Sequence, residues 1–347
     1  MIDFDDWAVI GYNDDTGIGN QLEAIKKDIG ISRHLVVPSK KLLTKPLNHK
    51  EVLINKNFTS DQLQSSLCGV RVLLFIETCG WHEKLIEIAS KLGIVTICLV
   101  NWEWFKTSDP IWKKIDYLAS ATRCTLRFLK RQGYTKLLYL PPPLKIENLP
   151  NRKITGKAKI FFHNAGIIDD DDRKGTFAVI SAFQKVNLPQ IQLIVRTQSK
   201  VDLRVKDRRI VVLQGNLEKR SDLYTVGEVA IQPSKLEGVG FNILEPVACG
   251  IPTITMNSDP MSEWVREKYL LVSSTIWRKK SFSNKMAGVR HAYLRNPSIS
   301  SLCKAIKWCA QNELGEISKK QRASSLSIFK KENLKRLWIE ELHKNNV

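Results

Sequence analysis

The chain has 347 residues, which is enough for two domains of ordinary size, and its 43% hydrophobic content is typical of a globular protein. No apolar run approaches the ~20 residues that cross a bilayer, and the N-terminus lacks the basic and apolar pattern of a secretory signal. The seven cysteines form no CxxC pair, so we expect reduced thiols in a cytoplasmic protein rather than a disulfide framework.

The net charge of +19 is concentrated near the C-terminus. Residues 264–347 hold 18 Lys or Arg against 6 Asp or Glu, and aromatic residues interrupt the basic stretch 277–295. Such a region suits an anionic partner: acidic lipid headgroups at the inner membrane face, an acidic glycan, or nucleic acid. A solvated basic surface without a partner is the other interpretation.

The first part of the chain alternates apolar runs of strand length with helix-like stretches. The expected strands are 7–10, 35–37, 70–76, 94–100 and 137–140, and the expected helices include 21–28, 84–92 and 119–132. This alternation predicts a parallel sheet with helices on both faces. Gly17 and Gly19 lie in a loop before the first helix, where they would let the backbone approach an anionic ligand.

Polar residues follow two of these strands. His82 comes after the strand 70–76, and Asn101 and Glu103 follow the strand 94–100. Because open parallel sheets bind ligands at the carboxyl ends of their strands, these three are candidate ligand-binding residues. Each could equally be a polar residue satisfied locally at a strand end.

Residues 147–159 are predicted to form a linker, and prolines 141–143 stiffen the segment that leads into it. A second alternation of strands and helices follows the linker. The expected strands are 160–162, 191–195, 209–213, 229–233, 253–256 and 269–272, and the expected helices are 176–185, 218–224, 242–249, 300–309 and 319–343. The fold class is therefore α/β, with two doubly wound, Rossmann-like domains at 1–145 and 155–315 and a C-terminal helical part at 316–347.

The stretch 234–252 organises the second domain. A buried strand leads into a turn containing Gly238 and Gly240, and a short helix then runs to Gly250. Glu237 lies in the turn and Glu245 eight positions later on the helix, so both carboxylates can face one crevice. We place Pro246 in the first turn of this helix, where its missing N–H costs nothing.

This pair of glutamates resembles the signature of the family 4 retaining glycosyltransferases, together with Pro233-Ser234 before it and residues 248–252 after it. The resemblance implies the GT-B architecture: two Rossmann-like domains facing a cleft, with the C-terminal helix crossing back to the first domain. It further implies transfer of a hexose from a nucleotide diphosphate sugar, such as a UDP or GDP sugar, to an acceptor hydroxyl with retention of configuration. No metal and no cofactor would be required, and the acceptor would be a glycan or a lipid-linked saccharide.

The resemblance also implies roles for single residues. In the first domain, His82, Asn101 and Glu103 would be the acceptor-binding residues. Glu237 would lie at the donor sugar, Glu245 would hold the ribose, and Lys174 of the step Arg173-Lys174-Gly175 would contact the diphosphate. Glu237 and Lys174 are therefore the predicted catalytic residues. The full predicted donor site comprises Gly17, Gly19, Arg173, Lys174, Arg196, Gln214, Asn216, Glu237, Gly238, Val239, Gly240, Phe241, Asn242 and Glu245.

The chain departs from the family pattern at two positions. Asn101 stands where many members have a His, and Ile167 stands where members often have an Arg. Arg173 or Arg196 is our candidate for the missing charge. The acidic run 169–172 is predicted to be a solvated loop without a metal, because four consecutive acids cannot all face one cation from a regular strand.

Two other functions remain open at this point. One is a glycosyltransferase that acts on modified nucleic acid through the basic C-terminal region. The other is a non-catalytic protein that binds nucleotide sugars, which the departures at Asn101 and Ile167 would suit.

Overall fold

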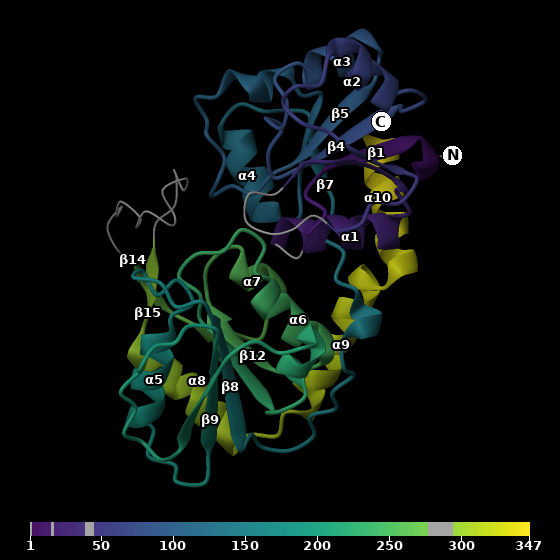
Figure 1. Cartoon of the computed structure of the whole chain (residues 1–347). Coiled ribbons are helices and arrows are strands. Elements are labelled where there is room, and N and C mark those ends of the chain that lie inside the picture. The colour runs from purple at the N-terminus through teal and green to yellow at the C-terminus, as the bar shows by residue number, and fades with distance from the viewer. Residues whose placement is uncertain (1, 15–16, 39–44, 277–293) are drawn as a thin grey trace. The chain divides into compact units, whose positions relative to one another are not determined.

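The computed structural model describes residues 2–14, 17–38, 45–276 and 294–347. The chain divides into two compact units: the first comprises Met1–Lys145 with Ile328–Val347, and the second comprises Ile146–Ser327. Each unit is built on its own parallel sheet (Figure 1).

The sheet of the first unit has seven parallel strands in the order β3-β2-β1-β4-β5-β6-β7. The strands are β1 (Trp7–Gly11), β2 (Arg33–Val36), β3 (Glu51–Leu53), β4 (Val72–Ile76), β5 (Val95–Leu99), β6 (Tyr117–Ser120) and β7 (Leu137–Tyr139). The helices are α1 (Gly17–Ile29), α2 (Ser60–Ser66), α3 (Leu85–Lys91), α4 (Arg123–Arg131) and α10 (Lys331–Lys344), with 3-10 turns at Phe4–Asp6 and Pro110–Lys114.

Helices cover both faces of this sheet. Apolar side chains of α1 and α10 pack on one face in a cluster that includes Trp7, Leu22 and Trp338. Those of α2, α3 and α4 pack on the other face with Phe75 and Leu129. Strands β2 and β3 follow β1 on one side of the sheet, and strands β5, β6 and β7 follow β4 on the other side. The strand order therefore reverses between β1 and β4, which is the place where such sheets bind ligands.

The sheet of the second unit has six parallel strands in the order β10-β9-β8-β11-β12-β13, with a separate antiparallel pair β14-β15. The strands are β8 (Ile160–Gly166), β9 (Gln192–Thr197), β10 (Ile210–Gln214), β11 (Val229–Gln232), β12 (Thr253–Met256), β13 (Leu271–Val272), β14 (Ser274–Ile276) and β15 (Arg295–Pro297). The helices are α5 (Thr176–Lys185), α6 (Phe241–Cys249), α7 (Met261–Trp264), α8 (Ile299–Gln311) and α9 (Gly315–Phe329), with 3-10 turns at Ile146–Asn148, Arg220–Tyr224 (η4) and Lys268–Leu270. Helices α5 and α8 pack together against this sheet and enclose its main core.

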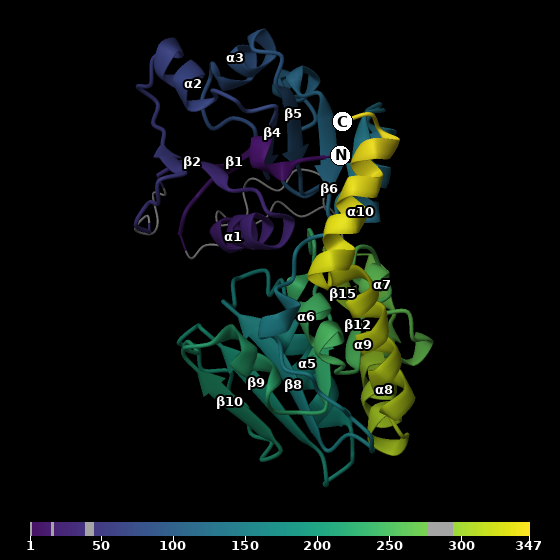
Figure 2. The same ribbon diagram turned by 90° about the vertical axis from the view of Figure 1, so that its right-hand side faces the viewer.

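The single helix expected at 319–343 is two helices, α9 and α10, because Lys330 between them is extended. Helix α9 stays with the second unit: the Ser318 hydroxyl donates to Gly250 O at 2.6 Å and accepts from Ile154 N. Helix α10 belongs to the first unit, where Trp338 Nε1 donates to Pro141 O at 3.0 Å (Figure 2). The boundary expected at residue 315 was therefore wrong, since residues up to Ser327 lie in the second unit.

Some of the expected elements also need correction. The start of the helix expected at 119–132 is strand β6, because these buried residues pair with β5, and the short strand β3 was missed. Gly17 and Gly19 lie inside the first turns of α1 rather than in a loop. Pro246 lies in the interior of α6, five positions after its first residue, rather than in its first turn. No helix among the described residues is long and apolar enough to span a membrane.

Candidate active site

The turn between β11 and α6 presents the N-terminus of α6 without a side-chain cap. Its N-cap is Gly240, whose φ of 85° is left-handed, a conformation that costs other residues free energy. The Trp264 indole N–H donates to Val239 O at 2.6 Å and fixes the turn. Backbone N–H groups at the start of α6 are therefore available to an anionic ligand.

Glu237 in this turn binds both basic residues of the Arg173-Lys174 step. The Lys174 ammonium lies 2.5 Å from Oε1, and Arg173 Nη1 lies 3.2 Å from Oε2 and donates to Leu236 O at 3.2 Å. Glu237 is only 6% exposed, so both ion pairs act in a partly desolvated site. The structure thus brings together residues that are 63 positions apart in the chain.

Gly175 allows this approach. It is the N-cap of α5 with a left-handed φ of 75°, and a Cβ added there would lie 2.7 Å from Pro233 O. The backbone of the same loop is joined to the turn by Lys235 N, which donates to Arg173 O at 2.8 Å. Only glycine fits at this position without a shift of the backbone.

The ionisation of this cluster favours a charged pair. Burial raises the pKa of the Glu237 carboxyl, but the charges of Lys174 and Arg173 outweigh it and hold the pKa below its usual value. Burial lowers the pKa of the Lys174 ammonium, and Glu237 opposes that effect. The cluster can therefore offer a carboxylate to sugar hydroxyls and two cations to a diphosphate.

Glu245 on α6 has different partners. The Tyr224 hydroxyl donates to its Oε2, and Arg220 Nε lies 2.8 Å from Oε1 and 3.0 Å from Oε2. Tyr224 is 1% exposed, and its burial, together with the Glu245 charge, raises its pKa well above the usual value. Sequence reasoning missed Arg220 and Tyr224, because their place beside Glu245 depends on how η4 packs against α6.

Asn242 lies in the first turn of α6, with Phe241 as the first residue of the helix. Its Nδ2 donates to Ser234 Oγ at 3.1 Å and to Gln232 Oε1 at 3.4 Å. Asn242 therefore ties the start of α6 to the end of β11, on the same turn as Gly238 and Val239.

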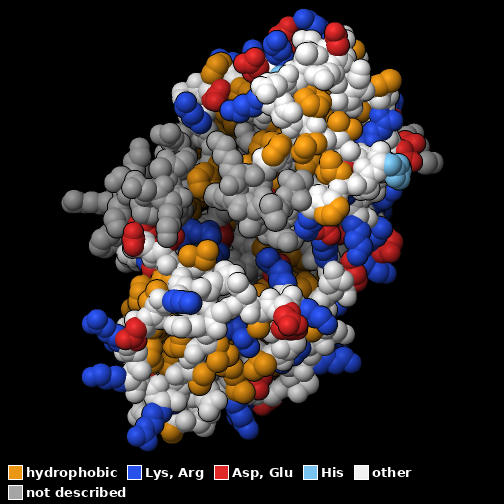
Figure 3. Space-filling view, in the orientation of Figure 1, with side chains coloured by type: hydrophobic (Ala, Val, Ile, Leu, Met, Phe, Trp, Pro, Cys, Tyr) orange, Lys and Arg blue, Asp and Glu red, His pale blue; other side chains and the backbone are white. Residues whose placement is uncertain are grey.

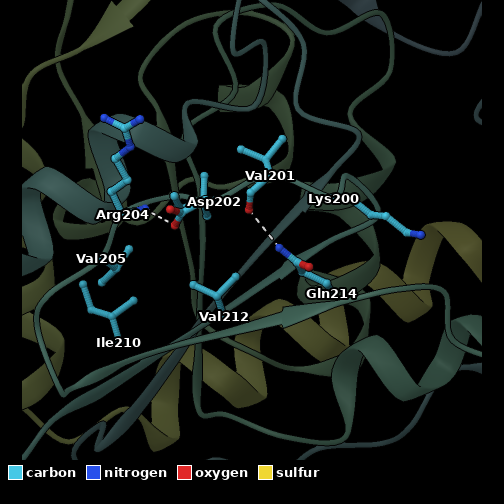
Figure 4. Close-up of a pocket in the computed structure, with 9 residues that line it drawn as sticks. Lys200, Val201, Asp202, Arg204, Val205, Ile210, Val212 and Gln214 are labelled. Atoms are coloured by element: carbon cyan, nitrogen blue, oxygen red, sulfur yellow. Dashed lines mark hydrogen bonds between the residues drawn. The ribbon is translucent and has the colours of Figure 1, made fainter.

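Three predicted donor residues have contacts elsewhere in the second unit. Gln214 Nε2 donates to Val201 O at 2.8 Å, and Asn216 accepts from Gln198 Nε2 at 2.7 Å. Gln214 lines an open hollow of about 590 Å³ under the loop before β10 (Figure 4). Arg196 lies on β9 in register with Leu213 of β10 and Asn164 of β8, and the structure shows no ion pair that would link it to either glutamate within the described residues.

The acidic run 169–172 is only in part the solvated loop that we expected, because Asp170 is exposed whereas Asp171 and Asp172 are buried. Asp171 and Asp172 are 6% and 5% exposed, and Asp172 accepts from Thr176 N at 2.7 Å and from Phe177 N at 3.2 Å. Asp172 therefore satisfies free N–H groups at the start of α5. Across the described residues, no group of three or more His, Cys, Asp or Glu side chains is placed to hold a metal ion.

The candidate acceptor residues belong to the first unit. Asn101 Nδ2 donates to Glu77 Oε1 at 3.1 Å, and His82 Nδ1 accepts from Lys84 N at 3.2 Å. Glu103 is 8% exposed. Sequence reasoning missed Glu77, although its place directly after β4, beside the reversal of strand order, was a signal that could have revealed it.

Glu77 has two further features of a functional residue. Its φ of 65° is left-handed, which is strained for a residue with a side chain, and burial raises the pKa of its carboxyl. Tyr12, which follows β1, contacts Trp81 edge to face at a ring-centroid distance of 5.0 Å.

Gly17 and Gly19 lie in α1 of the first unit. A Cβ at Gly19 would lie 2.2 Å from Asp14 O, so the absence of a side chain is explained by packing of the preceding loop. Their predicted contact with a donor phosphate remains a prediction.

Comparison with known proteins gives a family match for part of the second unit. Residues 168–291 match the family model described as Glycosyl transferases group 1. No curated protein matches the sequence.

Solved structures with a similar fold cover nearly the whole chain. A glycosyltransferase from Rickettsia africae has 12% sequence identity and a TM-score of 0.67, with 98% of each chain covered. The lipopolysaccharide outer core galactosyltransferase WaaB has 12% identity and a TM-score of 0.66, covering 97% of this chain and 99% of its own. An α,α-trehalose-phosphate synthase from Burkholderia xenovorans has 10% identity and a TM-score of 0.61, with 98% and 100% covered. The chain therefore has the fold of the GT-B glycosyltransferases, and its residues 168–291 carry the match to group 1 of the glycosyl transferases.

Proposed function

We propose that the protein transfers a sugar from a nucleotide diphosphate sugar to an acceptor hydroxyl with retention of configuration. The observation that carries this proposal is the cluster of Lys174 and Arg173 around Glu237, beside the uncapped N-terminus of α6. The match of residues 168–291 to the group 1 glycosyl transferases supports it.

The cluster suits the charges of such a reaction. As the bond between the sugar C1 and the diphosphate breaks, negative charge grows on the leaving phosphate oxygen, where Lys174 and the N–H groups at the start of α6 would stabilise it. Glu237 would accept hydrogen bonds from the donor sugar. The acceptor oxygen would bond to C1 on the face that the diphosphate leaves, and its proton would pass to a phosphate oxygen.

Glu245 would hold the ribose of the donor. A carboxylate accepts hydrogen bonds from two neighbouring hydroxyls, and Tyr224 fixes the direction in which this one points. A hexose carried by UDP or GDP is the donor class that we propose. The protein cations would balance the diphosphate, so we propose a reaction without a metal or another cofactor.

The acceptor that we propose is a glycan or a lipid-linked saccharide. Support comes from a structural relative whose name assigns it to the lipopolysaccharide outer core. The basic region 264–347 would then meet an anionic glycan or the inner membrane face; its segment 277–293 lies outside the described residues. In the lower half of the face drawn in Figure 3, most Lys and Arg side chains lie apart from one another, with hydrophobic and other side chains between them.

A donor panel tests the proposal. Purified protein is incubated with UDP- and GDP-hexoses, with and without EDTA, and release of the nucleotide is measured. We expect turnover of at least one donor, and a loss of about 100-fold or more in Glu237→Ala and Glu245→Ala, on the scale of a lost transition-state contact. Glu218→Ala, which removes an exposed acid from the same unit, is the matched control.

The outcomes separate the other functions. Binding of a nucleotide sugar without turnover of any donor would favour a non-catalytic binding protein. Salt-sensitive association with DNA, but not with acidic liposomes, would favour a nucleic acid acceptor. Unchanged rates in either glutamate variant would refute the role that we give to that residue.

A further inference from the structure

Arg220 lies in η4 beside the candidate site, and more than half of its side chain is exposed. Its Nε contacts both oxygens of Glu245, whose own side chain is 7% exposed, while the Arg220 side chain is 59% exposed. Neither Nη group forms a hydrogen bond or ion pair within the described part of the chain, and these two groups carry four of its five N–H donors. The guanidinium therefore contacts Glu245 through one edge and can take another partner.

Glu245 does not need Arg220 to keep its position. The buried Tyr224 hydroxyl donates to Oε2 of the same carboxylate. Tyr224 is itself held, because Arg152 Nη1 donates to Tyr224 O at 2.6 Å and Arg152 Nη2 donates to Gly227 O at 3.0 Å. If Arg220 moved away, the carboxylate would still be fixed by a buried hydrogen bond.

The charge of Arg220 also acts on the other half of the site. Burial lowers the pKa of the Lys174 ammonium. The charge of Glu237 opposes this shift, while the charges of Arg173 and Arg220 lower the pKa of Lys174 further. Arg220 thus lies within electrostatic reach of Lys174 as well as of Glu245.

We propose that Arg220 is a phosphate-binding residue that exchanges Glu245 for the diphosphate of a nucleoside diphosphate when that ligand binds. Tyr224 meanwhile keeps Glu245 directed at the ribose. This inference rests on the proposed function and names the residue that supplies the charge missing at Ile167, which is 66% exposed and apolar. A guanidinium suits the role because its planar fork of donors matches two phosphate oxygens.

The other two arginines fit this role less well. Arg173 already donates to Leu236 O and pairs with Glu237. Arg196 stands on β9, and nothing in the described residues links it to Glu237 or Glu245. Arg220 alone of the three pairs with Glu245.

Calorimetric binding to the full-length protein tests the exchange. The probes are whichever of UDP, GDP and ADP the wild type binds most tightly, and the monophosphate of the same nucleoside. We expect Arg220→Gln to weaken diphosphate binding about 10- to 100-fold, the value of one or two hydrogen bonds to a charged group, and monophosphate binding less than about threefold. Arg220→Lys should recover part of the loss.

Two variants control for indirect effects. Lys219→Gln removes a neighbouring exposed charge and should leave both affinities within about twofold of wild type. Tyr224→Phe should weaken the binding of the diphosphate and of the monophosphate by a similar factor, because both nucleotides contain the ribose that Glu245 would hold. Melting temperatures verify that each variant is folded.

The two hypotheses fail in different ways. Suppose that the wild type binds a nucleoside diphosphate. If Arg220→Gln binds it equally well, or loses affinity for the diphosphate and the monophosphate by the same factor, the inference is overturned and the proposed function stands. A diphosphate-specific loss in Arg196→Gln instead would also overturn it. If the wild type binds none of the nucleotides, both the inference and the proposed function are overturned.

Discussion

Glu77 combines a strained backbone with a buried carboxyl group. Its left-handed φ of 65° costs roughly 1–3 kcal/mol at a residue other than glycine, and such strain is often retained at functional sites. Its carboxyl accepts a hydrogen bond from Asn101, at the strand ends of the first unit where the strand order reverses. We therefore predict that Glu77 acts on the acceptor side of the proposed reaction.

Substitution of Glu77 tests this assignment. Glu77→Gln keeps an oxygen for Asn101 but removes the charge, so we expect transfer to acceptor to fall about 10- to 100-fold. Burial raises the pKa of Glu77, so the wild-type transfer rate should begin to fall on acidification at a higher pH than it would with a glutamate of ordinary pKa. This fall of the rate in acid should be absent from Glu77→Gln. Donor hydrolysis without acceptor should be unchanged, since the second unit is intact; equal transfer rates in both proteins would refute the assignment.

Helix α5 begins at a glycine that brings two segments of the candidate site together. Gly175 is left-handed, and a side chain there would meet Pro233 O at 2.7 Å. Gly166, at the end of β8, is left-handed too, but a Cβ added to it meets nothing within 4 Å. These two glycines separate the effect of backbone conformation from the effect of a clash.

Alanine substitutions at three glycines measure both effects. Gly166→Ala should cost about 1–2 kcal/mol in free energy of unfolding through its φ alone. Gly175→Ala should cost more and also lower donor turnover, because Lys174 would be displaced from Glu237. Gly156→Ala, in open space and without a positive φ, should be nearly neutral. Denaturant unfolding and the donor assay check the order, and equal costs at Gly166 and Gly175 would contradict it.

At the scale of the whole molecule, each unit holds a buried histidine. His34 is 1% exposed in the first unit and His163 is fully buried in the second, where its ring nitrogens contact Ile231 O and Thr176 Oγ1. Burial lowers the pKa of both imidazoles to about 4. Both histidines are therefore neutral in the folded protein at neutral pH.

These shifts predict a loss of stability in mild acid. In the unfolded chain each histidine binds a proton below about pH 6.5, whereas in the folded chain it does so only near pH 4. The contribution of the two neutral histidines to the free energy of unfolding is therefore fully present above pH 6.5 and is lost as the pH falls from 6.5 to 4. Each histidine should account for up to about 3 kcal/mol of this loss. Urea unfolding at pH 8, 6 and 5 measures it. His163→Gln should flatten the dependence for the second unit and exposed His49→Gln should not; a flat wild-type profile would contradict the prediction.

The sequence by itself determined the alternation of strands and helices and the pair Glu237 and Glu245, because hydrophobic periodicity and glycine turns are local properties of the chain. It also identified the Arg173-Lys174 step, although the ion pairs of these residues with Glu237 were visible only in the structure.

Only the tertiary structure decided which distant residues share the site. It placed Arg220 and Tyr224 on Glu245, gave Gln214 and Asn216 other partners, and assigned α9 and α10 to different units. The physical reason is that these contacts join segments whose separation is set by the packing of helices on a sheet. No local pattern of side chains encodes that packing.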